Sequence, residues 1–176
     1  KLWDNTLMDG LYEFERDELI QKIKNYYNTC CDIDGRPPSK IDFNELAKKV
    51  LDDFSDQITF KELTVTISEV GRLIVIMNPE LAHILFSNLL KNAIRHNTKK
   101  GKIEILVTDF SLQVSNSGIE KTLDPQNLFQ RFHKETNDKS STGLGLAIVK
   151  SIVDLCGYQI TYHYALGIHQ FTVVFK

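Results

Sequence analysis

The chain has 176 residues, of which 42% are hydrophobic and 25% are charged, and its formal net charge is −2. This balance is typical of a globular domain with one core and a short extension. The slightly negative charge argues against a nucleic-acid partner, and no apolar run approaches the ~20 residues of a membrane span.

Residues 1–31 carry a broken helical pattern, which Gly10 interrupts, and turn-forming residues over 32–40 predict a linker. We therefore expect the main domain to cover residues 41–176. The odd number of cysteines, without metal-ligand spacing, indicates reduced thiols. The histidines do not cluster with them, which argues against a zinc site.

Asp42 can cap a helix, and Glu45 three residues later completes a capping box. Apolar residues at helical spacing then continue to Phe54. Two strands are expected next, an alternating one over 63–68 and a short apolar one over 73–77.

A longer helix is predicted to start at Asn78, its cap, with Pro79 at the first helical position, and to reach about Asn97. Strands over 103–107 and 112–115 follow it. They are joined by a tight turn, which is typical of a hairpin.

The segment 117–142 is polar and aperiodic, and a stretch of this length is usually functional or mobile. Gly143 and Gly145 then start an amphipathic helix that ends before Gly157. Such a glycine-rich start exposes backbone N–H groups and the positive end of the helix dipole, which suits phosphate.

A hairpin over 158–164 and 171–175 closes the chain. Three helices and five or six strands, not in strict alternation, predict an α+β fold. We expect a two-layer sandwich in which a mixed sheet of about five strands carries the helices on one face.

The long helix carries a polar stripe, because four of its residues recur at helical spacing: Asn88, Asn92, Arg95 and His96. A carboxamide oxygen is a suitable ligand for Mg²⁺, and a guanidinium binds phosphate. A solvated polar face is the alternative interpretation of the same pattern.

Four segments, in this order, resemble the sequence boxes of the ATP-binding domain of sensor histidine kinases. That domain belongs to a superfamily with gyrase and the heat-shock chaperone ATPase. The segments are Ser87–Asn97 (asparagine box), Asn116–Gly118 (first glycine box), Leu128–Phe132 (phenylalanine box) and Thr142–Lys150 (second glycine box). The resemblance covers residues 41–176 and implies a Bergerat-type ATP-binding fold.

The resemblance implies ATP and Mg²⁺ as ligands. Asn92 would hold Mg²⁺, Asn88 would support the metal or a phosphate, Arg95 would contact phosphate, and His96 would lie beside the nucleotide. Further ATP contacts are implied at the two glycine boxes and just before the second: Asn116, Gly118, Ile119, Lys139, Thr142, Gly143, Leu144, Gly145 and Leu146.

Two residues depart from the family pattern, Asn116 and Glu120, and Glu120 stands where the family often has a second glycine. Asn116 stands where the family has Asp, and a flipped amide could donate to guanine, so we hypothesise weaker adenine selectivity. Asn88 stands where related hydrolases place a Glu as general base, which favours phosphoryl transfer over hydrolysis.

None of the five histidines fits the family's phosphoacceptor box, so we expect no catalytic residue in this chain. Residues 1–31 would be a remnant of the second helix of the phosphoacceptor hairpin. The expected partners are that hairpin, from the same protein, and the receiver domain of a response regulator. We expect a cytoplasmic domain of a membrane-anchored sensor, itself monomeric and without a membrane span.

Two alternatives stay open. An anti-sigma-type serine kinase shares this ATP fold and phosphorylates a partner protein. A degenerate module would bind a nucleotide without catalysis, and Asn116 keeps this alternative open.

Overall fold

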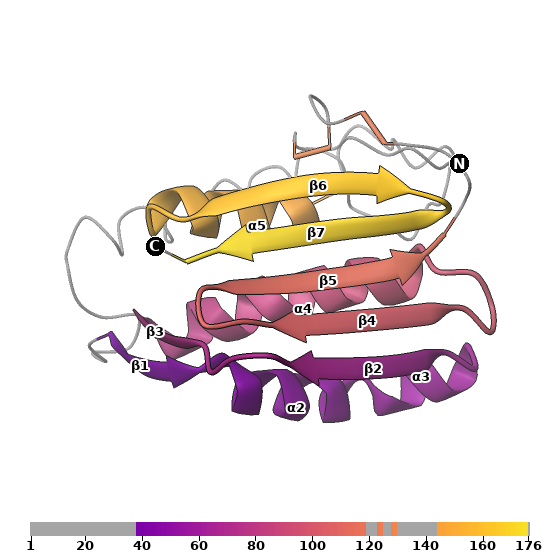
Figure 1. The fold of residues 1–176 in the computed structure, drawn as a ribbon, viewed down its shortest axis with the longest axis horizontal. Helices are drawn as coiled ribbons and strands as arrows, with labels where there is room; N and C mark the ends of the chain where they lie inside the picture. Colours follow the sequence, from indigo (N-terminus) through magenta and orange to yellow (C-terminus); the bar gives the residue numbers. More distant parts are fainter. Residues whose placement is uncertain (1–37, 119–122, 125–127, 130–143, 176) are drawn as a thin grey trace, which may run out of the picture. The chain divides into compact units, whose positions relative to one another are not determined.

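The computed structural model describes residues 38–118, 123–124, 128–129 and 144–175. Strands and helices alternate irregularly in this part of the chain (Figure 1). In chain order they are β1 (Ser39–Asp42), α2 (Phe43–Asp53), α3 (Ser55–Phe60), β2 (Thr64–Glu69), β3 (Ile74–Met77), α4 (Pro79–Arg95), β4 (Lys102–Val107), β5 (Ser111–Ser117), α5 (Gly145–Leu155), β6 (Gln159–Ala165) and β7 (Ile168–Val174).

A mixed sheet of five strands forms one layer, in the order β2-β4-β5-β7-β6. Strands β2 and β4 are parallel, and the other neighbours are antiparallel. Helices α4 and α5 lie behind the sheet in Figure 1 and contact each other. The predicted α+β sandwich with a mixed five-stranded sheet is therefore confirmed.

The inner face of the sheet is apolar along most of its length and polar at one end. Paired positions on neighbouring strands place Ile105, Val114 and Phe171 in one row of the core. In the row at the end of β5 the corresponding side chains are Ile103, Asn116 and His169. The polar end of this face is buried, because Asn116 is 2% exposed and His169 is 4% exposed.

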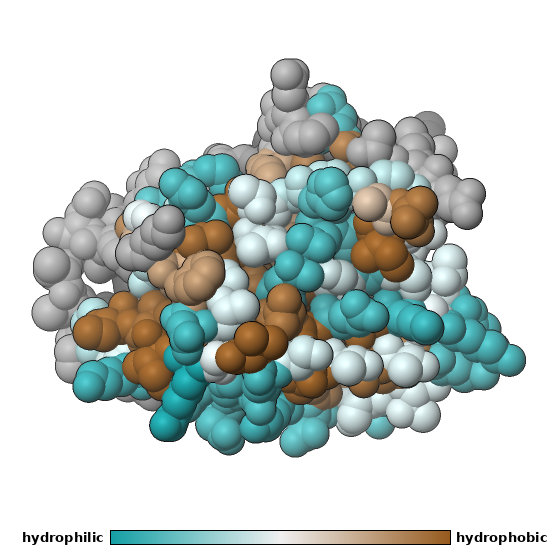
Figure 2. Space-filling model, in the orientation of Figure 1, coloured by the Kyte–Doolittle hydropathy of each residue, from teal (hydrophilic) through white to brown (hydrophobic). Residues whose placement is uncertain are grey.

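The opposite face of the sheet carries small polar and charged side chains such as Thr66 and Glu104, both exposed. Figure 2 shows this face as a mixture of teal, white and brown areas. Brown patches lie over β3, where Ile76 is exposed, and near the β6–β7 turn, where Leu166 is exposed. Alternation of apolar and polar residues along each strand thus directs the core toward the helices.

The β6–β7 hairpin closes through a two-residue turn. Leu166 and Gly167 both adopt positive φ angles, 50° and 77°. Positive φ at both central positions defines a type I′ turn, whose twist matches that of the strands. The turn pairs Ala165 with Ile168 and so fixes the register of β7.

Three features differ from the sequence-based expectations. Strand β1 was not predicted; it pairs with β3 in a separate two-stranded sheet, so β3 does not join the main sheet. Helix α3 was missed because its six residues are too short to show a helical period. Strand β5 also runs two residues beyond its predicted end, to Ser117.

Helix α5 buries only part of the stripe that helical spacing predicts, which consists of Leu144, Ala147, Ile148, Ser151, Ile152 and Leu155. Ala147 and Ile152 are buried as expected, together with Val149 and Val153. Ile148 is only half-buried. A helix this apolar presents several possible stripes, and the packing partner selects one.

No helix among the described residues combines the length and the apolar character that crossing a bilayer requires.

Helix α2 starts at a charged cap. The Asp42 carboxylate accepts hydrogen bonds from the backbone N–H groups of Asn44 (3.0 Å) and Glu45 (3.4 Å), and Arg72 donates to it at 2.9 Å. Burial opposes ionisation of this carboxyl, but the hydrogen bonds from Arg72 and from the two backbone groups outweigh it. They hold the pKa of Asp42 below its ordinary value of 3.8.

We expect Asp42→Ala to lower the free energy of unfolding by about 1 kcal/mol at neutral pH, because two N–H groups lose their acceptor. A depressed pKa stabilises the fold above the ordinary value, and this contribution is lost as the pH falls through the pKa of the folded state. The difference between the two proteins should therefore shrink below pH 3.8. Denaturant melts at several pH values measure this difference in the free energy of unfolding. Asp52→Ala, which changes an exposed residue of the same helix, serves as control.

Candidate nucleotide-binding site

Helix α4 carries the polar stripe that the sequence predicts. Asn78 caps it, accepting from the N–H groups of Glu80 and Leu81, and Pro79 occupies the first turn. Asn88 and Asn92 are half-buried on the helix, one turn apart.

Asn88 lies directly against the start of α5. Its Oδ1 is 3.2 Å from the position that a Cβ on Gly145 would occupy, and its Nδ2 donates to the Ile84 carbonyl at 2.8 Å. The amide is therefore oriented with its oxygen toward Gly145. The structure thus places Asn88 of the polar stripe next to Gly145 of the second glycine box.

The start of α5 differs from the starts of α2 and α4. Its N-cap residue is Leu144, which has no side-chain acceptor, and its first turn contains no acidic residue. Helices α2 and α4 are capped by Asp42 and Asn78. The first N–H groups of α5 thus find no acceptor in the side chain of their cap residue, and the helix dipole favours an anion at this end.

Asn116 is the buried polar residue at the end of β5. Its Nδ2 donates to the Ser117 carbonyl at 2.9 Å, and its buried Oδ1 is without a hydrogen-bond partner. Only the NH₂ end of the amide can face a carbonyl oxygen, which fixes the orientation of the side chain. Asn116 therefore offers an acceptor, as Asp would, and this hydrogen bond argues against the flipped amide behind the hypothesis of weaker adenine selectivity.

Gly118 lies where β5 meets the end of α4. A Cβ here would be 2.7 Å from His169 Cδ2, 2.9 Å from His169 Nε2 and 3.3 Å from the His96 carbonyl oxygen. A larger residue does not fit at this position, because its Cβ would collide with the His169 imidazole and crowd the backbone at the end of α4. The His96 side chain is exposed, and its backbone N–H donates to the Asn92 carbonyl.

A hydrogen-bond network ties the end of α4 to β5. Asn97 Nδ2 donates to the Lys102 carbonyl at 2.9 Å, and Ser117 Oγ donates to Asn97 Oδ1 at 2.7 Å. The Lys102 N–H donates to Ser117 Oγ at 2.8 Å. The network fixes His96 and Gly118 relative to each other, although the sequence indicated a role for neither Asn97 nor Ser117.

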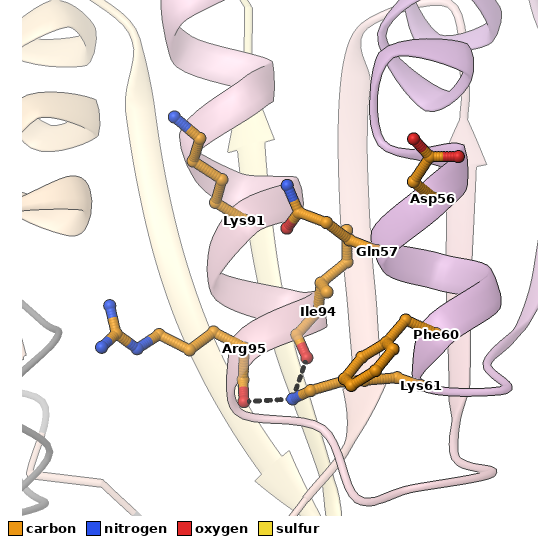
Figure 3. A pocket seen from close by; sticks show the side chains of 7 residues that line it. All are labelled: Asp56, Gln57, Phe60, Lys61, Lys91, Ile94 and Arg95. Atoms are coloured by element: carbon orange, nitrogen blue, oxygen red, sulfur yellow. Dashed lines mark hydrogen bonds between the residues drawn. The ribbon is translucent and has the colours of Figure 1, made fainter.

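Lys61, which follows α3, binds the last turn of α4. Its Nζ donates to the carbonyls of Ile94 and Arg95, both at 2.8 Å (Figure 3). A cation at a helix C-terminus satisfies free carbonyls and interacts favourably with the helix dipole. The guanidinium of Arg95 points away from Lys61 and Phe60.

A groove of ≈ 740 Å³ lies between α3 and α4, on the side of α4 that faces Lys61 (Figure 3). Its walls include Phe60, Lys61, Lys91 and Ile94. Arg95 is the one residue of the polar stripe that also borders this groove. The groove is therefore separate from the place where Asn88 meets Gly145.

Three aromatic residues for which the sequence indicated no role lie near the end of β5: Tyr162, Tyr164 and His169. Tyr162 Oη and His169 Nδ1 form a hydrogen bond of 2.8 Å, and the Leu123 N–H donates to the same Oη at 3.2 Å. Tyr164 packs on the His169 ring with 4.9 Å between ring centres. The only sequence signal was a histidine at an inward position of a strand, which is more often a core residue.

Four predicted ATP contacts lie outside the described residues: Ile119, Lys139, Thr142 and Gly143. Leu144 and Leu146 are half-buried at the start of α5. Phe129 of the predicted phenylalanine box packs edge-on against Phe171.

The described residues combine an α+β fold with a helix start whose cap residue has no side-chain acceptor, a carboxamide that faces this start, and a buried acceptor at the end of the sheet. Residues 77–176 match the model of the histidine kinase-, DNA gyrase B- and HSP90-like ATPase family. Because the match covers more than half of the chain, the chain belongs to this family. Membership implies that the domain binds ATP.

Relatives by sequence include the heme sensor protein HssS of two staphylococci. The Staphylococcus aureus (strain Newman) protein is 31% identical over 144 residues, which are 78% of this chain and 30% of that protein. The Staphylococcus saprophyticus protein is 30% identical over 120 residues, or 65% and 26% of the two chains. This chain thus spans less than a third of the length of these relatives.

The catalytic domain of the histidine kinase ThkA has the same fold. Its nucleotide-free structure superposes with a TM-score of 0.70 and 24% identity, over 78% of this chain and 94% of that domain. Because the two sequences are only 24% identical, the likeness shows the fold alone and assigns no role to individual residues of the site.

We expect Gly118→Ala to lower the free energy of unfolding by about 1–3 kcal/mol, because the new methyl group overlaps the His169 ring. The double variant Gly118→Ala/His169→Ala should lose less free energy of unfolding than the two single variants lose together. The difference should be at least about 0.5 kcal/mol. Urea melts of the four proteins measure this coupling. His163→Ala, at an exposed histidine of β6, serves as control and should be additive with Gly118→Ala.

Proposed function

We propose that this chain is the ATP-binding catalytic domain of a two-component sensor histidine kinase. It would transfer the γ-phosphoryl group of ATP to a histidine on a separate helical hairpin. The observation that carries the proposal is the contact of Asn88 with Gly145 inside the segment that matches the ATPase family. The likeness to HssS proteins over 78% of the chain supports the sensor-kinase assignment.

The phosphates would lie at the start of α5. The first N–H groups of this helix can donate to phosphate oxygens, and no acidic side chain in the first turn opposes an anion. Arg95 would supply a positive charge from α4, and Lys139, Thr142 and Gly143 would contribute from the segment before α5. Leu144, Gly145 and Leu146 would present backbone groups to the phosphates.

Mg²⁺ would be held by Asn92, with Asn88 supporting it from one turn earlier. Both are neutral carboxamides, half-buried on the same helix, and Asn88 already directs its oxygen toward Gly145. Carboxamide oxygens fit a cation that completes its shell with water and phosphate. When bound, Mg²⁺ would neutralise charge on the phosphates.

The adenine would lie at the end of β5. The buried Oδ1 of Asn116 can accept a hydrogen bond from the exocyclic amine, and a buried acceptor without a partner gains most from a ligand that supplies a donor. Gly118 and Ile119 would border the base, and His96 would lie beside the nucleotide.

In the transfer step the bond between the γ-phosphorus and the bridging oxygen of ADP breaks, and a phosphorus–nitrogen bond to the acceptor imidazole forms. Positioning and charge stabilisation supply most of the catalysis of phosphoryl transfer. Asn88 and Asn92 would orient the phosphates, and the N–H groups of α5 would stabilise their charge. A carboxamide at position 88 cannot accept a proton from water, so hydrolysis lacks a general base there.

The proposed partners follow from this reaction. The acceptor hairpin would belong to the same protein, and the receiver domain of a response regulator would take the phosphoryl group next. The domain would lie on the cytoplasmic side of a membrane-anchored sensor.

We expect Asn92→Ala to abolish Mg²⁺-dependent ATP binding, measured by calorimetry with and without EDTA. The domain should remain folded, because Asn92 is only half-buried. Gln57→Ala, which removes an exposed carboxamide from α3, should leave binding unchanged. In the longer parent chain Asn92→Ala should also abolish histidine phosphorylation; acid-stable phosphoserine on a partner protein would instead indicate an anti-sigma-type kinase.

ATP hydrolysis by this domain should be very slow, because no carboxylate stands at position 88 to activate water. Phosphate release under saturating ATP measures it. Rapid turnover that Asn92→Ala abolishes would contradict the assignment to a transferase, whereas rapid turnover insensitive to this change would indicate a contaminant.

A further inference from the structure

The groove between α3 and α4 takes no part in the function proposed above. Helix α3, which forms one of its walls, buries none of its six residues, so this helix does not complete a packed core here. The groove has a volume of ≈ 740 Å³, which is typical of sites that hold a ligand. It is therefore large enough to take a short segment of another molecule.

The ring of Phe60 borders this groove and is largely in contact with solvent. Phe60 is 85% exposed, which makes it the most exposed phenylalanine among the described residues. Single exposed apolar residues are common on protein surfaces. Beside a groove, however, a ring supplies the kind of contact that is enriched in binding interfaces, because it buries a large area at a low cost in side-chain entropy.

Two lysines give the groove a positive charge. Lys61 directs its Nζ to uncharged carbonyls of α4, and Lys91 Nζ lies 5.9 Å from the centre of the Phe54 ring. Among the described residues neither lysine forms an ion pair, whereas Lys48 and Lys99 do. A cation that no carboxylate neutralises attracts an anionic group, most strongly where the site is partly shielded from water.

The charge of the groove is opposite to that of the whole chain. Three of the seven lining residues are basic and one, Asp56, is acidic, although the net charge of the chain is −2. The guanidinium of Arg95 points away from Phe60, so the two lysines are the cations that a ligand in the groove would use. This surface is thus complementary to an acidic partner.

We propose that the groove between α3 and α4 docks an acidic segment of a partner protein, with a carboxylate paired to Lys91 and an apolar side chain packed on Phe60. The charge of Lys61 adds to the attraction for acidic residues. In Figure 3 the exposed carboxamide of Gln57 lies between the two lysines, where it can hydrogen-bond to the backbone of such a segment. A simple anion would use the charge alone and leave the ring exposed, so the combination of ring and cations favours a peptide.

A selection from a phage-displayed library of random peptides tests this inference, with the whole chain as bait and without nucleotide. A parallel selection uses the double variant Phe60→Ser/Lys91→Glu. Both residues are exposed, so the fold should persist, which circular dichroism checks. We expect the unaltered chain to enrich peptides that combine acidic residues with an aromatic or large aliphatic one, and the double variant to lose this enrichment.

The most enriched peptide, synthesised with a fluorescent label, then assigns the binding to residues by anisotropy. Phe60→Ser and Lys91→Glu should each weaken its affinity about tenfold, because each removes one anchor of a small interface. Phe110→Ser and Lys40→Glu make the same changes at exposed residues outside the groove and should leave the affinity unchanged. A peptide with lysines in place of its acidic residues should bind Lys91→Glu better than the unaltered chain.

Three results would overturn the docking site. The first is a selection that yields no acidic peptide whose enrichment depends on Phe60 and Lys91. The second is a loss of affinity in Lys91→Glu but not in Phe60→Ser, which would indicate attraction of anions only. The third is binding of phosphatidylglycerol vesicles, but of no peptide, to the unaltered chain and not to the double variant, which would indicate a membrane contact. None of them bears on the proposed ATP site, because no nucleotide is present.

Discussion

Helix α4 is fixed by polar side chains at both of its ends, and the other parts of the site are positioned by it. Asn78 accepts from the first N–H groups, and Lys61 donates to the last carbonyls. Between these ends the helix packs its apolar side chains into the core, including Leu85 and Leu89. The helix can neither slide nor rotate without breaking these hydrogen bonds or exposing that surface. Asn88 is held against Gly145 as a result, and the last turn is held against Gly118.

Much of the fold was predictable from local patterns. The cap at Asp42, the start of α4 at Asn78 and the strands of the main sheet follow from capping chemistry and alternation, which depend on neighbouring residues. Strand β1 and the placement of β3 could not be predicted, because they depend on pairing between segments far apart in the chain. The buried stripe of α5 depended in the same way on its packing partners.

The candidate site also combines features that local sequence patterns predict with features that only the three-dimensional structure reveals. Asn88 and Gly145 belong to segments with a clear helical period and a glycine signal, and the structure brings them together. The cross-strand pairing of Asn116 with His169 depends on strand register, and the orientation of the Asn116 amide depends on one hydrogen bond to the Ser117 carbonyl; neither is visible in the sequence. The sequence leaves open which end of the Asn116 amide would face a ligand, and the hydrogen bond from its Nδ2 to the Ser117 carbonyl is what orients it.

The two-residue turn at Leu166 and Gly167 has a consequence for how this family can change by insertion. Side chains of a strand alternate between its faces, so a slip of β7 by one residue would move His169 to the solvent face and bring Ile168 or Gln170 inward. Strand β7 is paired with both β5 and β6, so an inserted residue has to be absorbed by a longer loop or a bulge if both pairings are to persist. A single added codon at this turn thus tests whether loop geometry or strand pairing yields first.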